Sequence, residues 1–159
     1  MSDQGIRDHL GHMVGGEGAH AGFDKIVANF PVALRGVVPD GTAHSAWQLL
    51  EHLRIAQWDI LEFSRDAEHQ SPEFPTGYWP ESALPPSEAA WDNSIESFKA
   101  DRQEMVALVA NPATDVFATI PHGTGQTVFK EAYVVAKHNS YHLGELVMLR
   151  RLLGIWSES

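Results

Sequence analysis

Apolar residues recur at helical spacing in four stretches of the chain, and no pair of stretches alternates as two paired strands would. The four stretches cover approximately residues 19–36, 45–66, 87–110 and 127–153. Within each stretch the apolar positions repeat with a period near 3.6, so they line one face of a helix. The pattern therefore predicts an all-α four-helix bundle, with long crossover connections after the second and third helices.

Several residues have the right type and position to begin, bend or end these helices. Ser45 and Gln48 have the spacing of a capping box, and Ser87 is placed to cap the third helix. Pro31 should bend the first helix, because proline lacks the backbone N–H that a helix interior needs. Gly154 should end the last helix.

Composition and charge predict one globular domain over residues 1–159. The chain is 43% hydrophobic and 20% charged, which suits a single packed core. It has no apolar run of the roughly 18 residues that span a bilayer, and MSDQGIRDHL lacks the features of a signal peptide. We therefore expect a cytoplasmic protein with no membrane partner. The formal net charge of −10 repels phosphate backbones, so nucleic acid is not an expected partner.

The absence of cysteine restricts the metal chemistry that is open to the chain. With no cysteine, a tightly bound transition metal must be held by histidine and carboxylate side chains. In the segment KHNSYHLGEL, His138 and His142 lie four residues apart. On a helix they would stand one turn apart on the same face and could present two imidazoles to one ion. Chance also produces this spacing in a chain with 9 histidines.

His52 is the best candidate for a third ligand. It lies in the predicted 45–66 helix, close to the apolar face that carries Leu49 and Ala56. A third imidazole from a neighbouring helix would complete a three-histidine set with open positions for water or substrate, as in catalytic metal sites. Alternatively, the three residues are histidines at the edge of the core, hydrogen-bonded to carboxylates or carbonyls. Periodicity leaves both interpretations open.

Three further polar residues lie near these histidines by helical spacing. Glu145 follows His142 by three residues, where it could orient a ligand or contact a water on the metal; the alternative is a solvated carboxylate. Asp59, seven residues after His52, has the same two interpretations, and of these a surface residue is favoured. His20 is in line with the apolar positions of the first helix and could point into the bundle, although a buried, hydrogen-bonded histidine is the simpler interpretation. The remaining histidines are expected at the surface, in loops or near the terminus: His9, His12, His44, His69 and His122.

Two segments resemble the DinB-like (YfiT-like) superfamily of metal-binding four-helix bundles. They are HSAWQLLEHLRIAQWDIL and HNSYHLGEL, and the resemblance extends over nearly the whole chain, including YWP. It implies that one histidine of the second helix and two of the last bind a divalent metal, which here are His52, His138 and His142. It also implies a homodimer, and low-molecular-weight thiols are cosubstrates of some relatives.

These observations predict a metal-dependent enzyme or, alternatively, a noncatalytic metal-dependent binding or stress-response module. Three imidazoles suit Zn, Ni, Fe(II) or Cu, and we expect Zn or Ni. A divalent metal lowers the pKa of bound water or thiol, which would allow thiol transfer to a small molecule or its hydrolysis. We expect the substrate near the His20 side of the bundle, with Glu145 as proton acceptor. Asn139 follows the first histidine of the pair, where an HExxH metalloprotease has its general base, so protease activity is not expected.

Overall fold

The computed structural model describes residues 3–16, 18 and 20–157, and every long element in these residues is a helix. The isolated bridge between Thr119 and Thr127 is the one β pairing in this part of the chain. The short helix α2 (Phe23–Val27) packs on α5. Four longer helices form the bundle, with α1 and α3 each packed on both α4 and α5: α1 (Asp3–Gly15), α3 (Ala46–Arg65), α4 (Glu88–Ala110) and α5 (Val128–Leu152). The predicted all-α fold is confirmed.

The three predicted helices in the second, third and fourth stretches all form, and each begins at a side-chain cap. Ser45 Oγ accepts a hydrogen bond from the backbone N–H of Gln48, and the Gln48 side chain accepts one from the N–H of Ser45, so the capping box is complete. The side chains of Ser87 and Thr127 cap α4 and α5, and each accepts one hydrogen bond from a backbone N–H. Local sequence therefore fixes where these helices begin.

The predicted helix over residues 19–36 is wrong. Among residues 20–36 only Phe23–Val27 is α-helical, and Val32–Leu34 forms a 3-10 turn; residue 19 lies outside the described residues. Pro31 disfavours a helical backbone at the residue before it, and Asn29 adopts a positive φ of 51°. The apolar residues of this stretch are still buried, which explains why their spacing suggested a helix: Phe23, Ile26, Val27 and Phe30.

The first helix of the bundle is instead α1, which the apolar pattern did not reveal. The buried residues of α1 are Arg7, Leu10 and Val14. Because one of these three is an arginine, only two apolar residues at helical spacing mark the buried face of this segment. The Arg7 guanidinium lies 2.8 to 3.1 Å from three carbonyl oxygens at and beyond the end of α4, and donates hydrogen bonds to them: Val109, Asn111 and Thr114. These bonds tie α1 to α4.

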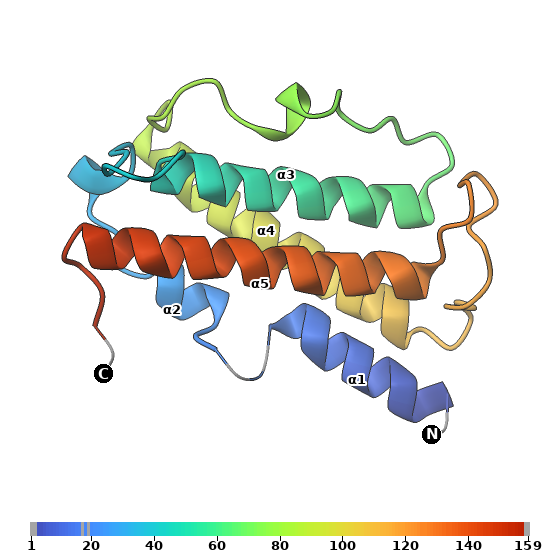
Figure 1. The fold of residues 1–159 in the computed structure, drawn as a ribbon. Coiled ribbons are helices and arrows are strands. Elements are labelled where there is room, and N and C mark those ends of the chain that lie inside the picture. Colours follow the sequence, from blue (N-terminus) through green and yellow to red (C-terminus); the bar gives the residue numbers. More distant parts are fainter. Residues whose placement is uncertain (1–2, 17, 19, 158–159) are drawn as a thin grey trace.

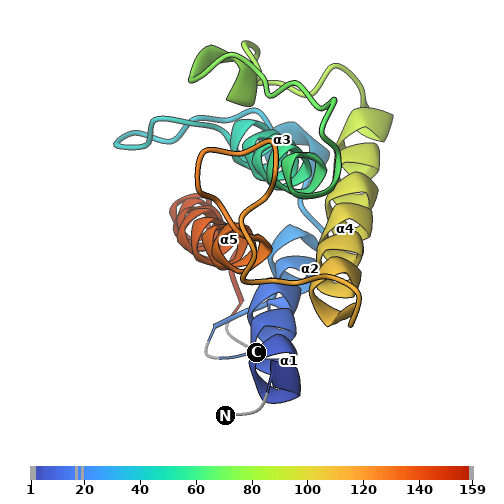
Figure 2. The same cartoon turned by 90° about the vertical axis from the view of Figure 1, so that its right-hand side faces the viewer.

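The connection between α3 and α4 runs along the whole bundle. Figure 1 shows that α3 and α4 point in the same direction, so residues 66–87 must return from one end to the other. Seen along the bundle, this crossover lies on the outer side of α3, away from α1 (Figure 2). The antiparallel helices α4 and α5 are joined by residues 111–127 at one end. The crossover is therefore placed to contact side chains of α3.

The apolar core is divided into two clusters by a polar layer. On α3, Leu53 belongs to one cluster and Leu61 to the other; on α5, Leu143 belongs to the first and Ala136 to the second. The interval between the clusters on α5, residues 137–142, contains both histidines of the predicted pair. A polar layer in a bundle core is costly unless its groups are paired.

A chain of hydrogen bonds crosses this layer, although Asn139 Oδ1 has no partner in it. The Asn139 Nδ2 donates to Gln57 Oε1 at 2.9 Å, and the Gln57 Nε2 donates to the carbonyl of Phe98 at 2.7 Å. Gln57 and Asn139 are both buried. These bonds fix α3, α4 and α5 relative to one another beside the histidines.

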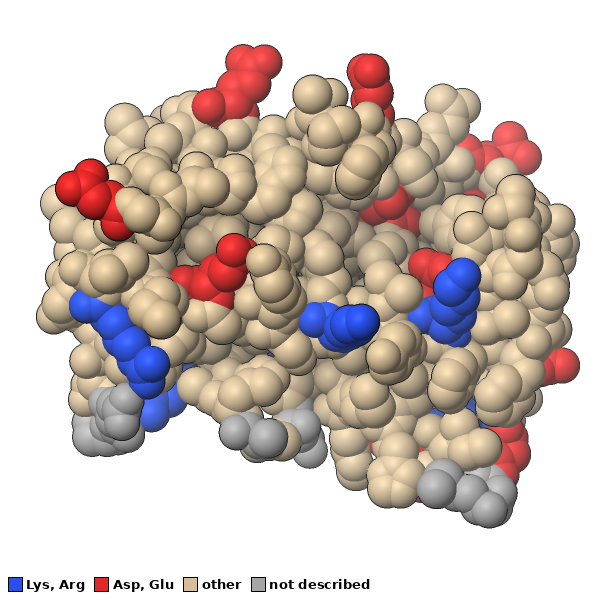
Figure 3. Space-filling model, in the orientation of Figure 1, with Lys and Arg blue, Asp and Glu red and all other residues tan. Residues whose placement is uncertain are grey.

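No helix among the described residues is long and apolar enough to cross a membrane. On the face drawn in Figure 3, a few basic side chains are spaced along α5, and acidic side chains are scattered over the face, several of them at its upper edge. The basic side chains do not gather into a patch on this face.

Candidate metal centre

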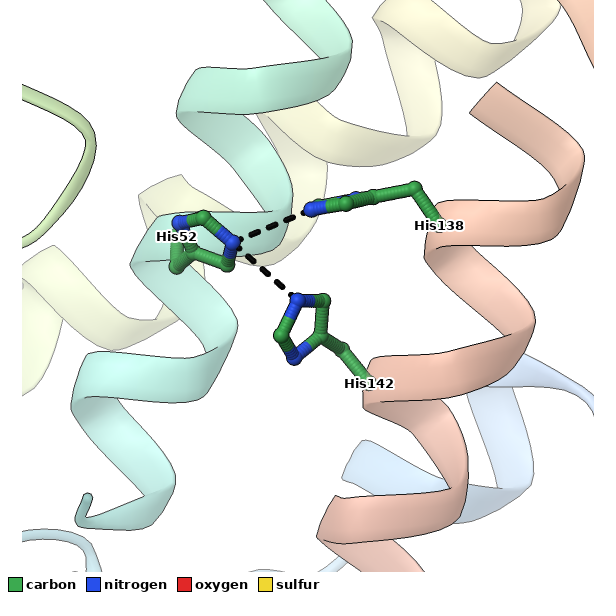
Figure 4. Close-up of side chains that lie close together, drawn as sticks. All are labelled: His52, His138 and His142. Carbon is green, nitrogen blue, oxygen red and sulfur yellow. Dashed lines mark hydrogen bonds between the residues drawn. The ribbon is translucent and has the colours of Figure 1, made fainter. Parts of the chain in front are cut away.

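The structure brings together the three histidines that the sequence singled out. His52 comes from α3, and His138 and His142 come from successive turns of α5. His52 Nε2 lies 3.0 Å from His138 Nε2 and 3.1 Å from His142 Nε2, and one ligand atom from each ring lies within 4.8 Å of the others. Figure 4 shows the rings pointing toward one place between the two helices. Within the described residues, this is the one group of three or more side chains able to hold a metal ion.

The crossover shields one side of this group. The indole of Trp79 stacks on the His52 ring with the centroids 3.8 Å apart and the planes 2° from parallel. His52 and His142 are buried and His138 is half-buried. The three imidazoles thus lie in a site that is partly removed from water, where electrostatic interactions are stronger than in solvent.

The hydrogen bonds on the far side of two rings determine which nitrogen carries the proton. His52 Nδ1 lies 2.9 Å from the carbonyl oxygen of Tyr78, which can only accept, so this nitrogen is the donor. His142 Nδ1 lies 2.5 Å from Glu145 Oε2 and donates to that carboxylate in the same way. In the neutral rings, Nε2 of both His52 and His142 is therefore left with a lone pair.

No proton is available at neutral pH to join these two nitrogens. Burial lowers the pKa of His52 below its ordinary value, and burial together with the neighbouring histidines lowers the pKa of His138 and of His142 to about 4. All three rings are then neutral, and two lone pairs face each other across 3.1 Å. A cation between them would remove the repulsion.

The separations of the nitrogen atoms fit a divalent metal. Nitrogens that bind Zn²⁺ tetrahedrally at about 2.0–2.1 Å lie about 3.3 Å apart. His52 Nε2 lies 3.0 Å and 3.1 Å from the Nε2 atoms of its two neighbours, which is close to this spacing. The Nδ1 partners described above are also of the kind that orient metal-ligating histidines, namely a carbonyl and a carboxylate.

Glu145 lies between the histidines and a surface cavity. One of its oxygens contacts His142, while its side chain remains 41% exposed, and burial raises its pKa above the ordinary value. The cavity has a volume of about 340 Å³. It is lined by Glu145 and by polar and apolar groups of α3, α5 and the segment before α3: Thr42, His44, Leu49, Met148 and Leu149.

His44, which was expected in a loop or at the surface, is part of this site. It stands just before α3 and is half-buried, with its ring stacked on the outer face of Trp79 at a centroid distance of 3.9 Å. His44, Trp79 and His52 thus form a stack of three rings. No periodicity marks His44, because it precedes the helix and meets Trp79 only through the crossover.

Two of the remaining expectations need correction. His20 is exposed and does not point into the bundle; its Nε2 lies 3.2 Å from Ser140 Oγ on the outer side of α5, because the helix that should have aimed it inward does not form. Asp59 is not at the surface but only 7% exposed, because the crossover covers this face of α3. Its carboxylate contacts His69 and Tyr78 of the crossover.

A comparison with protein families gives one clear match. The family model described as the DinB superfamily matches residues 17–146, which is most of the chain and includes all three histidines. No curated protein and no solved structure matches the chain.

Proposed function

The chain belongs to the DinB superfamily, and we propose that it binds one divalent metal through the Nε2 atoms of His52, His138 and His142. The observation that carries this proposal is the pair of Nε2 lone pairs that face each other at 3.1 Å, a contact that a cation stabilises and neutral imidazoles alone do not. Zn or Ni is the metal we propose, because three imidazole ligands suit both.

We propose further that the metal centre is catalytic. A closed structural zinc site has four protein ligands, whereas the ligand group among the described residues has three. When bound, such a metal lowers the pKa of a water or of a low-molecular-weight thiol, which supplies a nucleophile near neutral pH. The proposed reaction is transfer of a thiol to a small molecule, or hydrolysis of that molecule.

The cavity beside Glu145 is the proposed substrate site. It offers apolar contacts from Leu49, Met148 and Leu149, and polar groups from His44 and Glu145. The sequence suggested a substrate near His20. His20 instead contacts Ser140 on the outside of α5, and it does not line this cavity.

Glu145 and His44 bring polar side-chain groups to the cavity. Glu145 keeps Nδ1 of His142 protonated, and its partly exposed carboxylate can accept a proton from a group in the cavity. His44, on the same cavity wall, presents ring nitrogens that can donate or accept a hydrogen bond. Trp79 excludes water from one face of His52.

An electrophile panel tests the catalytic part of the proposal. Turnover is measured for the Zn- and Ni-loaded protein with and without low-molecular-weight thiols, against the metal-stripped protein and the His142→Ala variant. Turnover that needs both metal and thiol supports transfer, and turnover that needs metal alone supports hydrolysis. If no condition exceeds the metal-stripped control while one metal binds per chain, the catalytic proposal is overturned in favour of a noncatalytic metal-dependent binding or stress-response module.

We also propose a homodimer. Exposed apolar side chains recur on one face of α5, at Tyr141, Met148 and Leu152, and such a face favours a protein contact. Trp47 and Trp91 are buried in the core and are not part of this surface. Sedimentation should give a dimer at micromolar concentration, and a dimer weakened by Tyr141→Glu; only monomer in the unmodified protein would contradict the proposal.

A further inference from the structure

Asp59 is a buried carboxylate that joins α3 to the crossover. Asp59 Oδ1 lies 2.8 Å from Nε2 of His69, and Oδ2 accepts a hydrogen bond of 2.6 Å from the hydroxyl of Tyr78. Both partners belong to residues 66–87, and Asp59 is two helical turns beyond His52. A buried carboxylate is costly unless it is paired, and these two contacts provide the pairing.

Tyr78 connects Asp59 to the metal centre. Its hydroxyl is bonded to Asp59, while its backbone carbonyl accepts the hydrogen bond from Nδ1 of His52 at 2.9 Å. The next residue, Trp79, stacks on the same His52 ring. The position of residues 78–79 therefore sets both the tautomer and the orientation of His52, and Asp59 holds that position.

We propose that Asp59 is a positioning residue of the metal centre, which acts on His52 through Tyr78 without touching the metal. Without the Tyr78 carbonyl, Nδ1 of His52 loses its acceptor, and the ring can carry its proton on Nε2 instead. An Nε2–H would donate to His142 Nε2, so the protein would lose the lone pair that binds the metal. The link to metal affinity rests on the proposed function, whereas the effect on the tautomer does not.

A double-mutant cycle tests the proposal. Zn²⁺ affinity is measured by competition with a chromophoric chelator for the unmodified protein, Asp59→Asn, Tyr78→Phe and the double variant. Partners that orient a metal-ligating histidine typically change metal affinity by about 10- to 100-fold, so each single variant should bind about 10-fold more weakly or worse. Because both act through the same bond, the double variant should be no weaker than the weaker single variant.

A second readout separates positioning from a merely structural role. In metal-free protein, ¹⁵N spectra of the histidine rings report which nitrogen of His52 carries the proton. Nδ1–H should dominate in the unmodified protein, and the Nε2–H form should grow in both single variants. Glu62→Gln is the matched control. It removes a carboxylate of the same helix, but this carboxylate pairs with Arg65 and not with the crossover.

The outcomes distinguish this inference from the proposed function. If Asp59→Asn and Tyr78→Phe bind Zn²⁺ within about twofold of the unmodified protein, or if the His52 tautomer is unchanged, the inference is overturned. If the unmodified protein binds no metal, the proposed function fails, and the tautomer in metal-free protein still decides the role of Asp59. Should Asp59→Asn not fold, Tyr78→Phe carries the test, since it keeps the ring and the backbone carbonyl.

Discussion

The α5 side and the α3 side of the metal centre hold their histidines in different ways. On α5, His142 is fixed by Glu145, three residues further along the same helix. On α3, His52 is fixed by the carbonyl of Tyr78, which is 26 residues away in the crossover. The first contact can form as soon as α5 does, whereas the second needs the crossover to dock on α3. One half of the centre is therefore local, and the other half depends on tertiary structure.

Removing any one of the three histidine ligands should lower metal affinity the most, whether the ligand belongs to α3 or to α5. His52→Ala, His138→Ala and His142→Ala each leave two imidazoles, so metal affinity should fall by more than the roughly 100-fold that a lost supporting partner costs. Metal content after dialysis should drop from about one per chain to near zero, while circular dichroism still shows a helical protein. His9→Ala, which removes an exposed histidine of α1, is the control. Unchanged stoichiometry in any of the three variants would refute the assignment of that ligand.

Removing the local support should have a smaller effect. Glu145→Gln replaces the carboxylate that accepts from Nδ1 of His142, so Zn²⁺ affinity should fall by about 10- to 100-fold. A competition titration measures this, with Glu96→Gln as an exposed control of equal charge change. If affinity is unaffected, the helix alone orients His142 and the contrast between the two sides is lost.

Acid should weaken the metal-free protein through the α5 pair. Both His138 and His142 have a pKa lowered from 6.5 to about 4 by burial, so above pH 6.5 they are neutral whether the chain is folded or not. As the pH falls from 6.5 toward 4, the unfolded chain takes up protons that the folded chain refuses, and stability is lost. Urea unfolding at pH 7 and pH 5 should show a greater loss for the metal-stripped protein than for its His138→Gln/His142→Gln variant. An equal loss in both proteins would contradict the lowered pKa values.

Replacing His20 should have the smallest effect. His20 contacts Ser140 and the Ala21 carbonyl outside the bundle, so His20→Ala should change Zn²⁺ affinity by less than about twofold. The same chelator competition measures it. A loss comparable to that of Glu145→Gln would mean that a third side of the bundle also supports the centre.

The sequence predicted the helical half of this architecture well, for physical reasons. Capping residues and apolar periodicity are local, so α3, α4 and α5 form where the pattern indicated, and the i, i+4 pair on α5 meets His52 as expected. The helix predicted over 19–36 was wrong, because the spacing of apolar residues indicates which residues are buried and not which backbone conformation they adopt. Pro31 and Asn29 prevent a continuous helix there.

The other half could not be predicted because it depends on where the crossover lies. Asp59 and His44 look like surface residues until residues 66–87 cover α3 and bring Tyr78 and Trp79 to them. A backbone carbonyl such as that of Tyr78 also carries no side-chain signature. The partners of His52 therefore required the tertiary structure, whereas Glu145 followed from helical spacing.

A crystal structure of the Zn-loaded protein, with anomalous scattering at the zinc edge, would show directly whether the three histidines bind the metal. We expect one strong anomalous peak per chain, about 2.0–2.1 Å from the Nε2 atoms of His52, His138 and His142. The Nδ1 atoms of His52 and His142 should still donate to Tyr78 and Glu145. A peak bound by other residues, or no peak at these histidines in protein shown to contain zinc, would contradict it.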